Sequence, residues 1–308
     1  MLRASVVGIV VVLLVAKVVT GLNNLSTHWE KRTETVTFDA KATKAYEVLT
    51  PNGMVEFEGE DDSAKPAEIV ALLKAGASTD EGAQRALHAI EVTTDGRETP
   101  TCKIGWKWRV TPEPDWSAIV DFTIRAPKSA NLKAECHNGR IVVTNLQGDA
   151  KLSSHNGRIE ADTSGESLDA ETDNGEITAT FPGRKVNLRS HNGRIAVDLS
   201  EGHRVEGNIT THNGVVQVTV GKQTSCELVT KTHHGWRSRR SGKLGAGGEK
   251  LIVTTHNGAV LIDDAPTTVQ AAAPEWDETR LSRLRRRNND ERFRTICKDS
   301  SPETEDED

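Results

Sequence analysis

Aromatic side chains are scarce in this chain: they make up 4% of its 308 residues, and apolar residues as a whole make up 35%. Both fractions are low for a compact enzyme of this length. A protein of stacked repeats tolerates such a composition, because short columns of Ile, Val and Leu are enough to fill a narrow core. The composition therefore favours a repeat architecture.

Cysteine and basic charge are also limited. The four cysteines (Cys102, Cys136, Cys226 and Cys297) have neither the CxxC spacing of a zinc site nor the density of a disulfide framework. The formal net charge is −6, so there is no basic excess to attract a nucleic acid. No Gly-rich phosphate loop or Ser/His/Asp motif is present, and the acidic residues of the repeats are scattered, with no paired set that would face inward or into a groove. We predict no catalysis, no metal, no cofactor and no nucleic-acid partner.

The N-terminus carries an apolar run. Arg3 precedes it, Lys17 interrupts it, and it continues through Leu22. A basic residue followed by an apolar stretch is typical of a secretory signal peptide. A retained anchor is the alternative, short for a bilayer span, and a buried core helix is the third interpretation. We predict that residues 1–22 are a signal peptide or a membrane anchor, and that the protein is exported and either membrane-anchored or secreted to the cell envelope.

A short motif returns throughout the second half of the chain. A His-Asn-Gly or closely related triplet opens seven successive units, whose glycines are separated by 18, 18, 18, 21, 21 and 23 residues. Asn-Gly permits positive φ, so we expect one sharp turn at a fixed corner of each unit. The predicted turn residues are Asn138, Gly139, Asn156, Gly157, Asn174, Gly175, Asn192, Gly193, Asn213, Gly214, Asn257 and Gly258, with Gly235 in the sixth unit.

Each unit has two short strand patterns. Apolar residues follow the glycine with a period of two, as in Ile141 and Val143, and a second apolar pair precedes the next turn, as in Val186 and Leu188. Units of this size bury their apolar faces only by stacking. A β-sandwich is the competing all-β interpretation, but its turns would alternate between two ends. We predict an all-β, single-chain parallel β-helix (β-solenoid) with a small helical insertion near its N-terminal end.

We expect the solenoid to occupy residues 35–264, with regular coils in 131–264 and the first coil and helical insertion in 35–130. The first coil is expected around Asn52-Gly53, helices from Pro66 to Gly76 and from Ser78 onward, and strands near 102–110 and 118–124. These additions are expected to cover the N-terminal end of the stack. Residues 265–308 combine an arginine cluster with an acidic end, which is typical of a disordered tail; a partner-binding segment is the alternative.

The pattern resembles a known family. A strand ending Ile124-Arg125-Ala126-Pro127, then Leu132 and repeated Asn-Gly-hydrophobic units are similar to the bacterial putative-adhesin family of unknown function. The stretch 72–92 also resembles the short helical segment of those proteins. The resemblance covers residues 35–264 and implies an envelope-associated parallel β-helix, with no catalytic residues to carry over. This chain departs from the family pattern by placing histidine before Asn-Gly.

Stacking would align equivalent residues in columns. One column holds His137, His155, His191, His212, His233 and His256, interrupted by Asp173. The histidines could bind a metal or sense pH, or they could be structural and hydrogen-bond the turn below. The asparagines of the turns are expected to form an amide ladder. In the next column Glu176 falls between arginines, which is expected to balance charge.

The sixth unit breaks the apolar alternation with Trp236, Arg237, Arg239 and Arg240. We expect this segment to bulge from the stack, because an inward arginine needs a partner. It is a candidate site for an anionic or sugar ligand, against the interpretation of a solvated loop.

The resulting hypothesis is a non-catalytic, exported, adhesin-like binding or structural scaffold of the cell envelope. Its expected partners are envelope polysaccharide or another envelope protein, with the membrane contacted through the N-terminal segment. A metal- or pH-responsive module using the histidines is the alternative, and a polysaccharide-acting enzyme is third.

Overall fold

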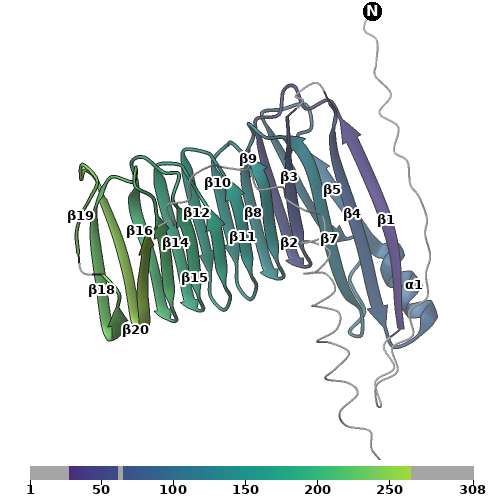
Figure 1. The fold of residues 1–308 in the computed structure, drawn as a ribbon. Coiled ribbons are helices and arrows are strands. Elements are labelled where there is room, and N and C mark those ends of the chain that lie inside the picture. Colours follow the sequence, from purple (N-terminus) through teal and green to yellow (C-terminus); the bar gives the residue numbers. More distant parts are fainter. Residues whose placement is uncertain (1–27, 62–64, 240, 265–308) are drawn as a thin grey trace, which may run out of the picture. The chain divides into compact units, whose positions relative to one another are not determined.

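A computed structural model describes residues 28–61, 65–239 and 241–264. The predictions for residues 1–22 and 265–308 lie outside these ranges. The described part of the chain is all-β apart from one helix, α1, which confirms the predicted class (Figure 1). Within the described residues there is no helix of the length and hydropathy that a bilayer crossing requires.

The elements before the regular coils are β1 (His28–Phe38), β2 (Ala45–Asn52), β3 (Val55–Glu60), β4 (Ala67–Ala77), α1 (Asp80–Ala89), β5 (Ile90–Asp95), β6 (Thr101–Trp108) and β7 (Ser117–Pro127). The coils that follow contain β8 (Asn131–Asn138), β9 (Ile141–Leu146), β10 (Ala150–Ser154), β11 (Ile159–Thr163), β12 (Ser167–Thr172), β13 (Ile177–Thr180), β14 (Lys185–Asn192), β15 (Ile195–Leu199), β16 (Glu206–Asn213), β17 (Val216–Val220), β18 (Cys226–Arg237), β19 (Gly242–Leu244) and β20 (Lys250–Asp264).

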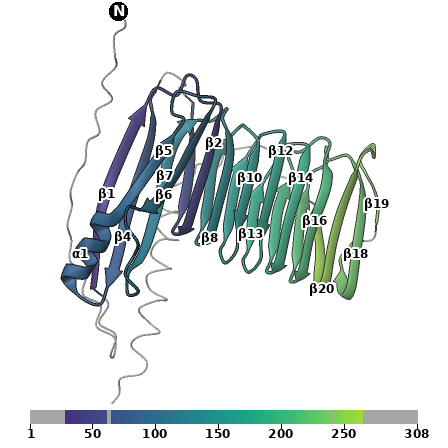
Figure 2. The same ribbon diagram turned by 180° about the vertical axis from the view of Figure 1, so that it is seen from behind.

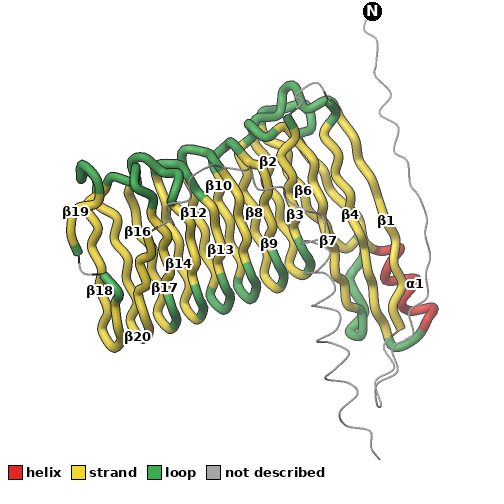
Figure 3. Tube along the Cα trace, viewed as in Figure 1, coloured by secondary structure: helices red, strands yellow, loops and turns green. Residues whose placement is uncertain are grey.

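Each repeat adds one strand to each of two parallel ladders. The strands before the Asn-Gly turn pair in the order β2, β8, β10, β12, β14, β16 and β20. The strands after it pair in the order β3, β9, β11, β13, β15, β17 and the end of β20. Figure 3 shows the turns as green loops that join the yellow strands.

The register places identical core residues on one another. Ile141, Ile159, Ile177 and Ile195 lie opposite each other in successive strands, and all four are fully buried. Burying one such side chain contributes about 1.5–3 kcal/mol. The apolar alternation in the sequence therefore corresponds to continuous columns that fill the space between the ladders.

The spatial order of the coils departs from chain order at both ends. β20 lies between the coil of β16 and β17 and strand β18, so the seventh unit stacks before the sixth. The coil of β2 and β3 is likewise out of order. β2 lies between β6 and β8, and β3 lies between β7 and β9. The expectation that the units stack in sequence order is wrong at these positions. The two arrangements are visible from opposite sides in Figures 1 and 2.

The predicted helix from Pro66 to Gly76 is wrong, because this segment is strand β4. Alternate side chains including Ile69, Ala71 and Leu73 are buried, and β4 pairs antiparallel with both β1 and β7. The run is apolar on successive positions, so its period alone did not separate a buried strand from a helix. The second predicted helix is α1, whose N-cap Thr79 accepts a hydrogen bond from the Gly82 amide at 3.0 Å.

The turn glycines are needed for close approach between coils. A Cβ on Gly157 would lie 1.7 Å from the carbonyl oxygen of Gly139, and one on Gly175 would lie 1.9 Å from that of Gly157. The expected reason, positive φ, was wrong for these regular turns: of the described Asn-Gly turns, only Gly53 and Gly258 have positive φ. The carbonyl group of each turn glycine occupies the space that a side chain on the turn glycine of the next coil would need.

Candidate functional site

The histidine column forms a stack of imidazole rings along one side of the strands that precede the turns. Ring centroids lie 4.6 Å apart for His137 and His155, 4.9 Å for His191 and His212, and 4.7 Å for His212 and His256. His233 follows His256 at 4.8 Å. In these described coils the rings stack on each other and do not hydrogen-bond the turn below. The predicted hydrogen bond from each histidine to that turn is therefore wrong.

Asp173 interrupts the stack. Its carboxylate is hydrogen-bonded to Nδ1 of His155, and both side chains are about half exposed. A protonated His155 therefore has a counter-ion, whereas His212 and His256 have imidazoles on both sides. The column is divided into a part next to a carboxylate and a part without one.

The turn asparagines form a hydrogen-bonded ladder. Each side-chain Nδ2 donates to the Oδ1 of the asparagine in the neighbouring coil, at 2.7–2.9 Å, from Asn257 through to Asn52. His234 takes the asparagine position in the terminal coil. The ladder holds the turns in register and so fixes the histidine and arginine columns on either side of it.

A column of buried hydroxyl groups lies directly inside the histidines. The hydroxyls of Ser154, Thr172, Ser190 and Thr211 donate to the turn-glycine carbonyl of the adjacent coil at 3.0–3.2 Å. The sequence interpretation missed this column, although a Ser or Thr precedes the triplet in six of the seven units. In the first of the seven units Cys136 takes this position, and its thiol donates to the Gly53 carbonyl at 3.1 Å. Burial raises the pKa of this thiol to about 11.

Ion pairs connect the column on the other side of the turn. Glu176 lies 2.7 Å from Arg158 and 3.9 Å from Arg194. Glu160 contacts both Arg140 and Arg158. Glu176 of the third coil therefore lies between two arginines, and the charges on this face are paired with one another.

A lateral groove runs beside the histidine column. Its second wall is formed by the residue two before each histidine and by the equivalent residues of the coils that have Pro51 or Asp173 in the histidine position. In stack order these are Leu49, Glu135, Ser153, Glu171, Arg189, Thr210, Thr254 and Lys231. Two hollows of about 510 and 460 Å³ make up the groove and share Glu171 and Asp173. The groove is acidic at the end near Leu49 and basic at the end near Lys231.

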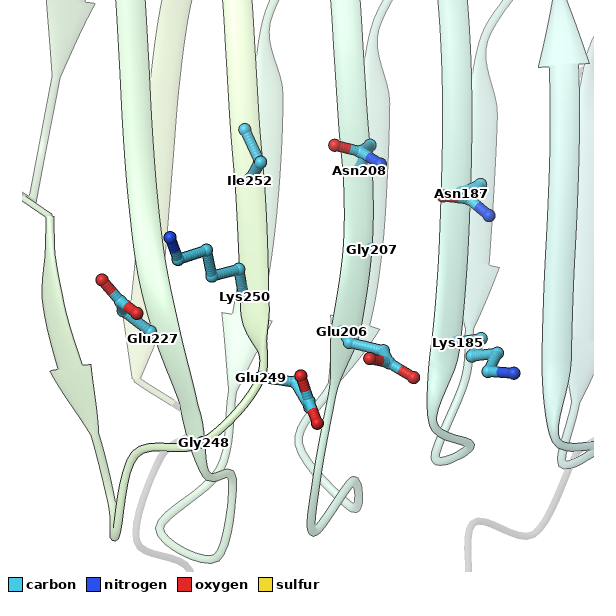
Figure 4. A pocket seen from close by; sticks show the side chains of 10 residues that line it. All are labelled: Lys185, Asn187, Glu206, Gly207, Asn208, Glu227, Gly248, Glu249, Lys250 and Ile252. Carbon is cyan, nitrogen blue, oxygen red and sulfur yellow. The ribbon is translucent and has the colours of Figure 1, made fainter.

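A third hollow, of about 560 Å³, lies on the same ladder, outside the lateral groove (Figure 4). It is lined by three glutamates, two lysines and two asparagines from neighbouring strands. Arg184 lies 3.2 Å from Glu206 and 3.9 Å from Glu249, so two of the acids share a cation. Within the part of the chain that the structure describes, no group of three or more His, Cys, Asp or Glu side chains is arranged to hold a metal ion.

The sixth unit is the last coil of the stack among the described residues and does not bulge from it, so that prediction is wrong. β18 pairs with β20 as far as Arg237. Ser238 then donates its backbone N–H to the Val260 carbonyl, and the Arg239 carbonyl accepts from the Thr230 hydroxyl on the other ladder. Arg237 Nη1 donates to the Thr230 carbonyl at 2.9 Å, and Arg239 Nη1 donates to Asp264 Oδ1 at 3.0 Å. Trp236 is 61% exposed, and Arg240 lies outside the described residues. Both arginines therefore have polar partners, and no further coil of the described residues covers them.

Acid should lower the stability of the folded protein through the histidine column. Burial, followed by the nearby charges of His212, His233 and His234, lowers the pKa of His256. The unfolded chain therefore binds more protons than the folded one near pH 6, and stability falls as the pH drops through about 6.5. We expect a lower thermal unfolding midpoint at pH 5.5 than at pH 7.5, and a smaller difference in His256→Gln. An equal difference in both proteins would contradict this account.

No family model and no curated protein matches this chain. Solved structures do match. A Clostridium sporogenes protein described as a putative cell adhesion protein is 12% identical, with 76% of this chain and 100% of that one covered, at a TM-score of 0.35. A putative adhesin from Parabacteroides merdae is 12% identical, with 77% and 96% covered, at 0.41. One from Bacteroides fragilis is 12% identical, with 76% and 97% covered, at 0.35. These are bacterial proteins of the kind that the sequence resembles.

Proposed function

We propose that this chain is a non-catalytic, exported scaffold of the cell envelope, adhesin-like in function, which binds an extended partner along the lateral groove. The observation that carries the proposal is the groove itself. It continues across coils from Leu49 to Lys231, and each coil contributes the same two positions to its walls. A linear partner fits such a surface better than a small molecule does, because equivalent contacts recur every ~4.8 Å.

We further infer that the two ladders form a single-chain parallel β-helix over residues 35–264. Parallel pairing between consecutive repeats, in one register on both sides of the turn, supports this arrangement. The arrangement matters for function because it makes the groove rigid. Its walls stand on hydroxyl, amide and glycine contacts that recur through the regular coils.

Export is inferred from the basic-apolar pattern of residues 1–22. Cell fractionation followed by protease treatment of intact cells tests it. The protein should be in the envelope fraction and accessible to the protease. Recovery in the cytosol would overturn this part of the proposal.

Steric blocking tests the groove without assuming a ligand chemistry. Thr210→Cys and Thr178→Cys, each in a Cys297→Ser chain, would be coupled to a maleimide polymer; Thr210 lines the groove, whereas Thr178 is exposed on the other ladder. Burial raises the pKa of Cys102, Cys136 and Cys226 to about 11, so these thiols should react slowly. Co-sedimentation with purified envelope polysaccharide should be lost on blocking Thr210→Cys and kept with Thr178→Cys. Equal retention would remove the groove from consideration.

A further inference from the structure

We propose that the basic half of the lateral groove binds a linear acidic polysaccharide and holds it more tightly once the histidines that line it are protonated. The inference rests on the proposed function and specifies its ligand. The site comprises Arg189, Thr210, Thr254 and Lys231 on one wall and His191, His212, His256 and His233 on the other.

The spacing of the cations defines the ligand. Arg189, Thr210, Thr254 and Lys231 lie opposite one another in consecutive strands of the stack. Three strand spacings separate the two cations, or about 14 Å, and two threonine hydroxyls lie between them. A polymer with many hydroxyl groups and a negative charge on only some of its units matches this order of cation, hydroxyl, hydroxyl, cation.

The two cations are available to a ligand. Arg189 is 72% exposed, and its contact with Glu171 is a long one of 3.9 Å. Lys231 is exposed and forms no ion pair within the described residues. Exposed pairs such as Arg189 with Glu171 contribute little, so an anionic ligand replaces that contact at small cost.

The acidic half of the groove limits the site. Glu135, Glu171 and Asp173 repel an anionic chain that extends beyond Arg189. A single strand of nucleic acid carries a charge about every 3.4 Å, which is far denser than the cations of the groove. The groove also offers no Trp, Tyr or Phe from the described residues on which bases would stack. The geometry therefore favours a sparsely charged polysaccharide.

The histidines add charge that depends on pH. The groups facing His256 are His212, His233 and His234, with Lys231 and Arg189 on the opposite wall; the carboxylates that line this hollow are Glu171 and Asp173, at its boundary with the acidic half. Protonated rings 4.7–4.9 Å apart repel one another. A bound carboxylate or phosphate relieves that repulsion, so protonation and ligand binding stabilise each other.

The first experiment measures affinity of the full chain for hyaluronan, a polysaccharide with a carboxylate on alternate sugars, for neutral dextran and for a single-stranded DNA oligonucleotide. We expect hyaluronan to bind more tightly than dextran and DNA. Dextran binding equal to that of hyaluronan would overturn the proposal, and so would tighter binding of DNA, which would assign the groove to nucleic acid.

The second experiment uses substitutions that the chain itself contains in the same columns. In the double variant Arg189→Ser, Lys231→Thr, the new residues are those that other coils have in the same column, at Ser153 and Thr210. In the control variant Lys151→Asn, Lys185→Ser, the new residues are likewise those at Asn187 and Ser167 in their own columns. Both remove two positive charges from one ladder. Affinity for the acidic polymer should fall about tenfold in the first variant and be unchanged in the control. Equal losses would overturn the site.

The third experiment tests whether the histidines cause the pH dependence of binding. Binding of the unmodified protein should be about tenfold tighter at pH 5.5 than at pH 7.5, and the polymer should raise the thermal unfolding midpoint more at pH 5.5. His212→Gln with His256→Gln should remove most of this dependence on pH. A dependence that survives in this variant would overturn the role of the histidines. If the blocked Thr210→Cys protein loses polysaccharide binding while these charge and pH tests fail, the groove remains a binding surface and only its ligand class is wrong.

Discussion

Gly157→Ala should prevent the stack from forming at that coil. The new Cβ would lie 1.7 Å from the Gly139 carbonyl oxygen and 2.7 Å from the Ser154 hydroxyl. Only the hydroxyl can rotate away, so two adjacent coils must separate. Separation breaks the Asn138–Asn156 hydrogen bond and loosens the isoleucine column beneath it. We expect destabilisation above about 4 kcal/mol, in the range seen when packing has no room to relax. Chemical denaturation or, if the protein does not fold, soluble yield measures it.

Gly242→Ala is the matched control. A Cβ at Gly242 meets nothing within 4 Å, and its backbone is not in the left-handed region. Its stability should stay within about 0.5 kcal/mol of the unmodified protein. A mild effect at Gly157, similar to that at Gly242, would show that the coils can move apart and that close approach does not explain the glycines.

A chain that ends at Gly248 should lose the protection of β18, although every residue of β18 is still present. β18 pairs along most of its length with β20, which this chain lacks. β20 also buries Leu251, Val253, Val260 and Ile262, and each such side chain contributes about 1.5–3 kcal/mol. Hydrogen exchange should become fast in residues 226–237 and remain slow in β14 and β15.

A chain that ends at Asp264 provides the comparison, because it keeps β20 and should retain slow exchange in β18. If β18 stays protected in the shorter chain, it has moved onto β16 and taken the position of β20. That outcome would mean that the out-of-order arrangement is not required. The sequence argues against it, since Arg237 lies opposite buried Val260, where a core layer would need an apolar residue.

The fold of the regular coils could be predicted because one short sequence pattern, repeated in each coil, specifies both the turn and the buried positions. The turn at Asn156-Gly157 and the alternation after it repeat with constant spacing, and parallel stacking then follows from the need to bury Ile159 and its equivalents. The turn geometry was misjudged because Asn-Gly is also the signal for positive φ. Contact between coils, which one repeat does not display, is what requires the glycine.

The ends could not be anticipated in the same way. β4 is apolar at consecutive positions, with alternate side chains buried and those between them part-buried, and such an apolar run is shared by buried strands and helices. The position of β20 depends on which unit can offer a complete apolar layer, and the sixth cannot. The histidine column was predicted as a set, but its order was wrong at His256 and His233 for the same reason.

The contacts that hold a coil reach only its immediate neighbours. Thr172 bonds to Gly157, Asn174 bonds to Asn156, and Gly175 packs on Gly157, so each partner lies one unit away. Excision of residues 155–172 would join Ser154 to Asp173 in the same register, with both ends of the stack unchanged. Length can therefore vary by whole units during evolution. A unit gained or lost between Asp173 and Lys231 would shift the distance between the acidic boundary and the outermost cation by one strand spacing.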